Sequence, residues 1–399
     1  MKNFGIICEF NPIHNGHVHL IDEARKLGAE RIVCVMSGNA VQRGELALFD
    51  KYTRAKAALE CGVDLVLELP FPWSCASAEY FSKAGIYILS QFCDTVIFGS
   101  ECGNIDNLRR SAENASDDKF RDEFFRRTKS GEGSAQTYFD MLFANGGCGF
   151  SSNDLLGIEY IRAAVLLAPE LNFITVRREG SPYNSKELTD SLYPSSTALR
   201  TLWQEERFED SKKYIPESAY RIFENAYFDG EMNDIYQLSR AVLMYLRLSD
   251  PKEFEQCAEA GGGIAHRICS IAHECSTLEE LLLRLSTKRY TDTKLKRALL
   301  FCLTKVNREA IAELPKYTTL LAANLYGRDI LSANRRTGGV KVVTKYADAP
   351  LDSPQYILGH RLESIFSLAK MQTTSSGDYI KKSAYIKADI QNDITYPLG

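Results

Sequence analysis

Two histidines and a glycine stand close together near the amino terminus, in the run FGIICEFNPIHNGHVHL from Phe4 to Leu20. An apolar stretch ends at Cys8, and a polar turn then delivers His14, Gly16 and His17 to the start of an expected helix. A glycine lets backbone approach a ligand, a helix amino terminus presents N–H groups to anions, and imidazoles donate hydrogen bonds. These residue types predict a site for the phosphates of ATP. An isolated H-x-G-H match also fits an ordinary capped helix, so its place after the first strand is what favours a ligand site.

A second polar group follows the next expected strand, in the run MSGNAVQRGE from Met36 to Glu45. Loops after neighbouring strands of a doubly wound sheet share one edge, so this loop is expected beside the first motif. Arg43 has the charge to contact a phosphate or a carboxylate, and Gln42 has the amide to orient a small acid. Lys51 and Arg54, one helical turn apart, are expected to extend two more positively charged side chains toward the same ligand. The alternative is a surface loop that closes onto a capped helix.

Three further positions follow later strands. Gly99, in FGSE, gives a purine or ribose room against the backbone, or else forms a simple turn. Asn153, in SNDLLG, suits either a ligand contact or a helix cap. The pair Arg177 and Arg178 follows the fifth expected strand.

The run SSTALR, from Ser195 to Arg200, places hydroxyls at a helix start and an arginine one turn later. Hydroxyl caps are common, so this run gains meaning from H-x-G-H about 180 residues upstream. The imidazoles are expected to hold the α- and β-phosphates, while Ser196 and Arg200 hold the departing pyrophosphate. The combination predicts adenylyl or cytidylyl transfer, in which positioning and charge neutralisation do most of the catalysis.

Alternating strand-like and helix-like patterns over the first two hundred residues must position these groups. This βαβ alternation predicts an α/β fold with a doubly wound, Rossmann-like parallel sheet covered by helices on both faces. The expected strands are Phe4–Cys8, Arg31–Met36, Leu65–Leu67, Thr95–Phe98 and Phe173–Val176, and the expected helices between them are His17–Leu27, Lys51–Cys61, Ser77–Gln91 and Asn153–Leu167.

The length of 399 residues favours two domains. We expect a catalytic domain over 1–212, with a mostly helical insertion near 104–147. From about Ile215 the strand rhythm stops, and 213–399 is expected to be a mainly helical domain.

Composition excludes several classes of protein. Hydrophobic residues make up 45% and charged residues 25%, as in ordinary globular proteins, and no apolar run is long enough to cross a bilayer. Eleven cysteines without a C-x-x-C pair argue against both a disulfide framework and a thiolate zinc site. We therefore expect a cytoplasmic protein without membrane association or a metal-ligand cluster. Mg²⁺ is compatible with a triphosphate substrate, although no group of carboxylates requires it.

Positive charge is concentrated late in the chain. The window from Leu281 to Lys345 holds 14 Lys and Arg against four Asp and Glu, an excess of ten, while the whole chain has a net charge of −4. Such a block is typical of a phosphate-backbone binder, and a solvated helix face is the alternative. The RNA-contacting candidates are Lys288, Arg289, Lys294, Arg297, Arg335 and Arg336.

The pairing of H-x-G-H with S-S-T-x-x-R resembles the nucleotidyltransferase superfamily, relatives of class I aminoacyl-tRNA synthetases. The blocks EFNPIHNGH, MSGNAVQRGE, DLVLELP, FGSE, SNDLLGIEYIRA and STKRYT resemble the bacterial tRNA(Met) cytidine acetate ligase family, roughly from Phe4 to Thr291. The resemblance implies a nucleotidyltransferase domain followed by a helical, tRNA-binding domain. The sequence departs from the family pattern at Asp292-Thr293-Lys294, where relatives tend to carry arginines, so part of the expected RNA surface is altered.

The resemblance also implies a two-step reaction with ATP, acetate and elongator tRNA(Met), without an obligatory protein partner. Acetate is activated as acetyl-adenylate, and the acetyl group passes to the exocyclic amine of the wobble cytidine, giving N(4)-acetylcytidine. Two alternatives are a small-molecule adenylyltransferase of coenzyme metabolism and a non-catalytic RNA-binding protein with a relic nucleotide fold.

The candidate site residues form two groups. The candidates for catalytic contacts are His14, His17, Gln42, Arg43, Ser196 and Arg200. The resemblance implies an ATP site made of Ile7, Cys8, Glu9, Phe10, Asn11, Pro12, Ile13, His14, Asn15, Gly16, His17, Val18, His19 and Leu20, joined by Gly99, Asn153, Arg178 and Arg177.

Overall fold

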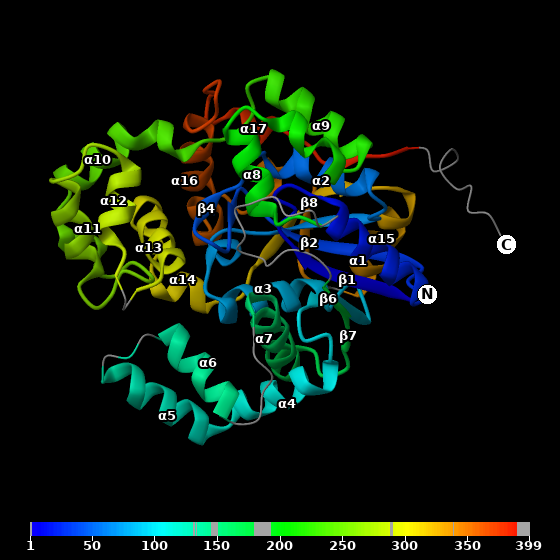
Figure 1. The fold of residues 1–399 in the computed structure, drawn as a ribbon. Coiled ribbons are helices and arrows are strands. Elements are labelled where there is room, and N and C mark those ends of the chain that lie inside the picture. Colours follow the sequence, from blue (N-terminus) through cyan, green and yellow to red (C-terminus); the bar gives the residue numbers. More distant parts are fainter. Residues whose placement is uncertain are drawn as a thin grey trace.

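A mainly parallel sheet forms the centre of the molecule (Figure 1). The computed structural model describes residues 2–130, 132, 134–144, 151–178, 193–287, 290–337 and 339–388. The strand order is β10-β8-β5-β2-β1-β6-β7, with β9 beside β8. The strands are β1 (Asn3–Cys8), β2 (Arg31–Ser37), β5 (Leu65–Leu69), β6 (Thr95–Ser100), β7 (Asn172–Arg177), β8 (Tyr317–Ala323), β9 (Lys341–Val343) and β10 (Tyr385–Ile386). All five strands expected in the first half of the chain are confirmed, each within two residues at either end.

Helices cover both faces of this sheet because its strands are apolar on both sides. In β1, Phe4, Ile6 and Cys8 join one hydrophobic core, while Ile7 joins the core on the opposite face. The first face is covered by α1 (Asn15–Lys26), α2 (Lys51–Glu60), α8 (Ser196–Gln204) and α9 (Glu217–Phe228), and the second by α3 (Ala78–Leu89), α4 (Ile105–Ser116), α7 (Ser152–Leu167) and α15 (Leu325–Thr337). This arrangement is the predicted doubly wound α/β fold.

The strand order reverses at β1, which lies between β2 and β6 and is parallel to both. After β2 the chain continues to a helix on one face of the sheet, and after β6 it continues to a helix on the other face. The loops beyond the carboxyl ends of these strands therefore separate and leave a crevice. Open α/β sheets bind ligands at such a point. The H-x-G-H motif follows β1 directly and therefore opens into this crevice.

A helical subdomain, defined as residues 235–304, lies beside the sheet (Figure 1). Its own core contains Leu and Ile side chains together with four buried cysteines. It consists of η3 (Ile235–Leu238), α10 (Ser239–Leu248), η4 (Pro251–Phe254), α11 (Ile264–Ala272), α12 (Leu278–Leu285) and α13 (Asp292–Thr304). The expected insertion after β6 is helical where it is described, with α4 followed by α5 (Asp118–Lys129) and α6 (Ser134–Ala144).

The second half of the chain returns to the sheet, contrary to the expectation that the strands stop near Ile215. β8 pairs antiparallel with β5, and β9 and β10 both pair parallel with β8. The β8 run YTTLLAA is buried at every position, so it has neither the alternation of a half-exposed strand nor enough β-branched residues to mark it. The sheet therefore extends across the boundary predicted at 212–213. The remaining helices are α14 (Arg308–Ala312), α16 (Pro354–Leu368) and α17 (Asp378–Lys381), with turns of 3-10 helix at η1 (Trp73–Cys75), η2 (Phe208–Tyr214) and η5 (Tyr346–Asp348).

Two of the compositional expectations can be compared with the described residues. No helix among them combines the length and apolar character needed to cross a bilayer. All ten cysteines in the described ranges are free thiols, and seven of them, including Cys34 and Cys302, are buried.

Candidate active site

A cavity lies at the carboxyl ends of β1, β6 and β7, at the reversal of strand order. Its lining draws on the H-x-G-H, MSGNAVQRGE, FGSE, SNDLLG and SSTALR motifs and on the Arg177-Arg178 pair. The helices that begin there are α1, α7 and α8, so three helix amino termini surround one space. Such termini present unpaired N–H groups and partial positive charge, which suits an anionic ligand.

The two histidines of H-x-G-H cap α1 and hold each other in place. His14 is the N-cap residue, and its Nδ1 accepts a hydrogen bond from the Gly16 N–H at 3.1 Å. The His17 Nδ1 accepts from the His14 N–H at 3.2 Å, and the two ring centroids are 3.9 Å apart. A Cβ on residue 16 would lie 3.0 Å from the His14 ring, so a side chain there would crowd the imidazole. Because each Nδ1 is an acceptor, each neutral ring carries its proton on Nε2 and offers that N–H as a donor.

Burial keeps both imidazoles uncharged. Burial, together with the charges of His17 and Arg178, holds the pKa of His14 well below its usual range. Burial and the Arg178 guanidinium lower the pKa of His17 to about 3. Neutral rings near pH 7 donate hydrogen bonds without losing a proton or adding a charge of their own.

The serine motif meets the histidine motif across 182 residues of sequence. The His14 Nε2 lies 3.1 Å from the Ser196 Oγ, and with Nδ1 occupied as an acceptor the ring is the donor. Ser195 caps α8 by accepting from the Ala198 N–H at 3.1 Å, which leaves the first turn of α8 open to the cavity. One turn later Arg200 donates from Nη1 to the Asn11 carbonyl at 3.1 Å. The imidazoles and the α8 terminus therefore form one wall of the cavity.

Gln42 and Arg43 reach the cavity from a hairpin of β3 (Ala40–Val41) and β4 (Glu45–Leu46). The Gln42 backbone N–H donates to the Glu9 Oε1 at 3.0 Å, which ties the hairpin to the end of β1. Burial raises the pKa of Glu9, although the N–H of Gln42 opposes that rise. Gly44 follows with φ of +79°, and a Cβ there would lie 2.7 Å from the Lys296 carbonyl carbon of α13. The hairpin is thus packed directly against the helical subdomain.

Lys51 and Arg54 do not extend the positive charge of the cavity, contrary to the sequence expectation. Neither residue lines it. The buried Lys51 Nζ pairs with Glu68 at 2.7 Å and with Glu363 at 3.2 Å. The buried Arg54 guanidinium donates to backbone carbonyls at the ends of β1 and β2, including that of Glu9 at 2.5 Å. Their helical spacing is as expected, but the face they share points into the protein, where Arg54 holds the strand ends that carry the site.

The later candidates form the opposite wall. The Asn153 Nδ2 donates to the Glu101 Oε1 at 2.7 Å, and the Arg178 Nε lies 3.7 Å from the same oxygen. Ser151 occupies the cap position of α7, so the capping role considered for Asn153 is wrong. A Cβ on Gly99 would lie 3.1 Å from the Arg178 Cγ, so the absence of a side chain lets that arginine lie close to β6.

Most of the sequence candidates line the cavity. All six candidates for catalytic contacts do so, as do Gly99, Asn153, Arg177 and Arg178. Within the Ile7 to Leu20 run, four residues are outside the lining: Pro12, Ile13, Asn15 and Val18. Ile13 is buried in the core, and the Asn15 Nδ2 donates to the Lys213 carbonyl at 3.1 Å.

Sequence reasoning missed several lining residues. Tyr193 and Pro194 directly precede the SSTALR run, and the Tyr193 ring stacks on His19 with centroids 5.5 Å apart. Because both residues adjoin that motif, the sequence could have indicated them as part of the site. Leu156 and Tyr160 belong to the SNDLLGIEYIRA block, but only the packing of α7 on β6 turns them toward the ligand space.

Only two of the six RNA-contacting candidates have described side chains. Lys288 and Arg289 lie outside the described residues, and Arg335 and Arg336 belong to α15 with side chains that are likewise outside the description. The Lys294 Nζ lies 5.4 Å from the centre of the Tyr290 ring. Arg297, which is largely buried, pairs with Glu259 at 3.2 Å.

Acidic residues from other parts of the chain pair with some of the cations in the basic window. The pairs that link a window cation to an acid outside it are Arg284 with Glu274 and Glu280, Lys296 with Glu45, Arg297 with Glu259, and Lys305 with Glu253. Among the described residues, four of the window's cations are therefore paired with acids from other parts of the chain.

Carboxylates are scarce around the cavity. Among the described residues no three His, Cys, Asp or Glu side chains gather where they could hold a metal ion, and Glu9 is the one carboxylate in the cavity lining. A divalent cation that enters with a triphosphate would thus depend mainly on phosphate oxygens for its ligands.

Comparisons with known proteins agree on one family. A family model described as HIGH Nucleotidyl Transferase matches residues 1–380. A tRNA(Met) cytidine acetate ligase of Clostridium perfringens (strain SM101 / Type A) is 31% identical over an aligned length of 403, covering 95% of this chain and 98% of the relative. The protein of the same name from Caldicellulosiruptor bescii is 32% identical over 364, covering 89% and 90%.

Solved structures agree with the sequence relatives. The chain is similar to TmcAL from Thermotoga maritima with a TM-score of 0.90 for the apo crystal form and 0.87 for the form bound with alpha-thio ATP. Sequence identity is 26% in both cases, and the match covers 98% of this chain and 100% of that chain.

Proposed function

The chain belongs to the HIGH nucleotidyltransferase family, among its tRNA(Met) cytidine acetate ligases, and from this membership we propose what its cavity does. It binds ATP and acetate, forms acetyl-adenylate, and transfers the acetyl group to the exocyclic amine of the wobble cytidine of elongator tRNA(Met). The products are N(4)-acetylcytidine, AMP and pyrophosphate, and the work is done in the cytoplasm.

In the first step an acetate oxygen attacks the α-phosphorus of ATP. The bond from that phosphorus to the bridging oxygen breaks, and pyrophosphate leaves with the bonding electrons. The Nε2–H groups of His14 and His17 donate to phosphate oxygens, while Ser196 and Arg200 hold the leaving pyrophosphate at the start of α8. Fixed donors of this kind stabilise charge as it develops in the transition state, because they need no reorganisation when it forms. Gln42 and Arg43 orient the acetate.

In the second step the cytidine amine attacks the acetyl carbonyl carbon. The carbon–oxygen bond to AMP breaks, AMP departs with the bonding electrons, and its phosphate takes up the proton that the amine loses. Cytosine's amine is a weak, neutral nucleophile at pH 7. Proximity is therefore the main source of rate, and it can supply roughly 7–11 kcal/mol. Acetyl-adenylate is a reactive anhydride, so the site must also keep water from it until the amine arrives.

One observation carries the proposal: the His14 Nε2 and the Ser196 Oγ lie 3.1 Å apart in one cavity, although 182 residues separate them. The alpha-thio ATP bound by the Thermotoga relative supports a nucleotide as the ligand of this chain. Mg²⁺ is proposed only as a companion of the triphosphate. When bound it would neutralise phosphate charge, with Glu9 the nearest carboxylate to assist.

The test incubates the protein with ATP, labelled acetate and bulk tRNA. The proposal expects label in tRNA that depends on ATP, together with acetate-dependent exchange of pyrophosphate into ATP. Release of pyrophosphate without acetate, but with a small nucleotide or coenzyme precursor present, would favour a small-molecule adenylyltransferase instead. RNA binding with neither activity would leave a non-catalytic RNA-binding protein.

A further inference from the structure

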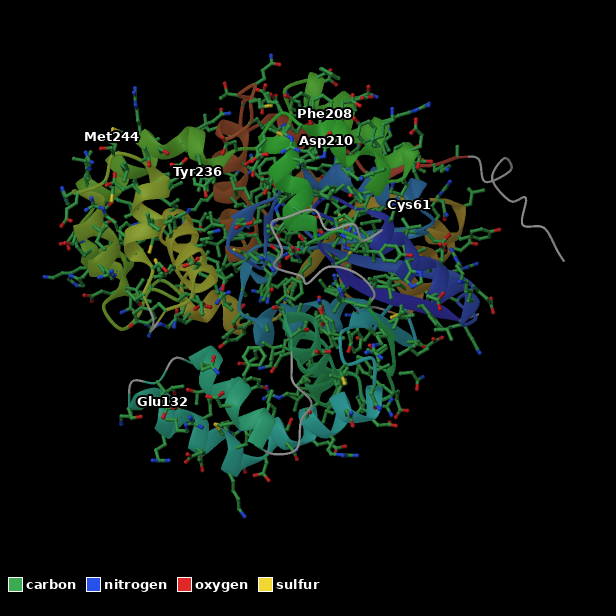
Figure 2. All side chains as sticks on the ribbon, viewed as in Figure 1. Cys61, Glu132, Phe208, Asp210, Tyr236 and Met244 are labelled. Carbon is green, nitrogen blue, oxygen red and sulfur yellow. The ribbon has the colours of Figure 1, made fainter. Side chains whose placement is uncertain are left out.

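A second cavity adjoins the proposed ATP site and shares two wall residues with it, Thr197 and Arg200 of α8. Its other walls come from the β3–β4 hairpin and the turn that follows it, from η3, and from α12 and α13 of the helical subdomain. The second cavity therefore lies where the sheet and the helical subdomain meet. Figure 2 labels Tyr236, which lies at the edge of the helical subdomain and lines this space.

An ion cluster stands at the junction of the two cavities. Glu45, at the end of the hairpin, pairs with the Lys296 Nζ at 2.5 Å and with the Arg200 Nη2 at 3.6 Å. These side chains are partly exposed, at 30% for Glu45 and 27% for Lys296, so a ligand in the cavity reaches them. Burial opposes ionisation of Glu45, but the charges of Arg200 and Lys296 outweigh it and lower the pKa of that carboxyl. The junction thus offers an ionised acceptor between two cationic donors.

The rest of the lining suits a flat, uncharged ring. Leucines of α12 and α13, with Leu282 among them, form an apolar wall, and Tyr236 adds an aromatic ring. The formal charges of Glu45 and Asp234 balance those of Arg200 and Lys296. A phosphate would prefer an excess of positive charge, whereas a nucleobase needs apolar surface together with matched donors and acceptors.

We propose that this second cavity, between the β3–β4 hairpin, α8 and the helical subdomain, binds the acceptor pyrimidine of the RNA after that base has left its stack. This inference rests on the proposed function and names the place of its second substrate. The ring packs between Tyr236 and the leucine wall. The Glu45 carboxylate accepts from the exocyclic amine, and the Lys296 ammonium beside it donates to the adjacent ring nitrogen. The amine thereby faces the ATP cavity through their shared wall.

Different residues of the β3–β4 hairpin line the two cavities. Gln42 and Arg43 line the first cavity, whereas Glu45 and Leu46 line the second. Gly44 stands between them, against the α13 backbone. A base in an anticodon loop is single-stranded, so it can be splayed out and recognised by stacking and by its hydrogen-bonding edge. A pocket formed jointly by the catalytic sheet and the helical subdomain is suited to receive it.

The experiment fills the second cavity and compares the two half-reactions. Leu282→Trp, on α12, places a large ring in the cavity, whereas Leu283→Trp adds the same bulk to the next residue, whose side chain is 77% exposed. Acetate-dependent exchange of pyrophosphate into ATP reports the first step, and labelled acetate in tRNA reports transfer. For Leu282→Trp, kcat/KM for tRNA is expected to fall at least tenfold relative to the exchange rate. For Leu283→Trp, this ratio should stay within twofold of the parent.

A second variant protects the test against misfolding of the first. Tyr236→Ala should raise the KM for tRNA about tenfold, because stacking of a base on an aromatic ring is worth that much or more, and Tyr236→Phe should restore it. Equal loss of exchange and transfer in the folded Leu282→Trp protein, or normal transfer in both variants, would overturn the inference. A parent protein without acetate-dependent exchange would instead overturn the proposed function.

Discussion

The histidine motif has two roles, and replacement of His14 by asparagine separates them. His14 caps α1 by accepting from the Gly16 N–H, and it also directs its Nε2–H toward the cavity and Ser196. Asparagine is among the best N-cap residues, so His14→Asn keeps the first role. Its side chain is too short to replace the Nε2–H donor, so it removes the second. His14→Ala removes both.

The expected magnitudes follow from these contacts. Loss of the cap in His14→Ala should lower the free energy of unfolding by about 1 kcal/mol more than His14→Asn does. Both variants should lose the phosphate donor, and removal of one such donor costs roughly 10²–10³ in rate, or about 3–4 kcal/mol. Activity should therefore fall equally in two proteins that differ in stability.

Two assays check this reasoning. Acetate-dependent exchange of pyrophosphate into ATP gives the rate of activation, and urea denaturation gives the free energy of unfolding. Affinity for tRNA is the control, and it should largely survive in both variants. Exchange in His14→Asn within threefold of the parent would refute the donor role, and equal stability of the two variants would refute the capping role.

Four other changes test separate parts of the structure. Burial holds the pKa of His17 near 3, whereas an unfolded histidine titrates near 6.5. The free energy of unfolding should therefore fall as pH drops from about 6.5 to about 3. The fall should be roughly 3 kcal/mol, which is less than the full pKa difference implies because a cavity-lining ring is partly solvated. His17→Gln should flatten this slope in urea titrations at several pH values. Lys51→Met leaves two buried carboxylates without their cation and should cost about 3–5 kcal/mol in thermal or urea unfolding, while the KM for ATP in the surviving folded protein stays near that of the parent. Gly44→Ala places a Cβ against the α13 backbone at a positive φ, so it should lower the melting temperature and slow transfer to tRNA, and a parent-like melt would count against the close packing seen here. Replacement of Arg335 and Arg336 by glutamine should weaken tRNA binding and flatten its salt dependence without changing ATP affinity, as filter binding at several salt concentrations would show.

Local patterns predicted much of the fold. Strands such as β2 and β6 were recognisable because they are short apolar runs between amphipathic helices, and such runs are buried in nearly any parallel sheet. The helix after H-x-G-H and the helix after Ser195 were recognisable by their capping residues. β8 was missed because its burial comes from neighbours far away in sequence rather than from its own pattern.

Charge was the property that sequence predicted least well. Lys51 and Arg54 have the composition and spacing of a phosphate-binding pair, yet both face inward, where partners from distant segments hold them. Lys296 and Arg297 counted toward a basic block until the fold brought Glu45 and Glu259 to them. Electrostatic energy depends on distance in space and on burial, and neither can be read along a chain.

Residue types and their local spacing were enough to establish the chemistry available to this protein: which helix ends carry imidazoles and hydroxyls, and that they belong to a doubly wound sheet. Such features are local, since capping and strand patterns depend on residues a few positions apart. Tertiary structure alone decided that His14 and Ser196 touch, that both imidazoles are neutral, and that a second cavity opens beside the first. Those properties arise from burial and from contacts between segments that only the folded chain brings together.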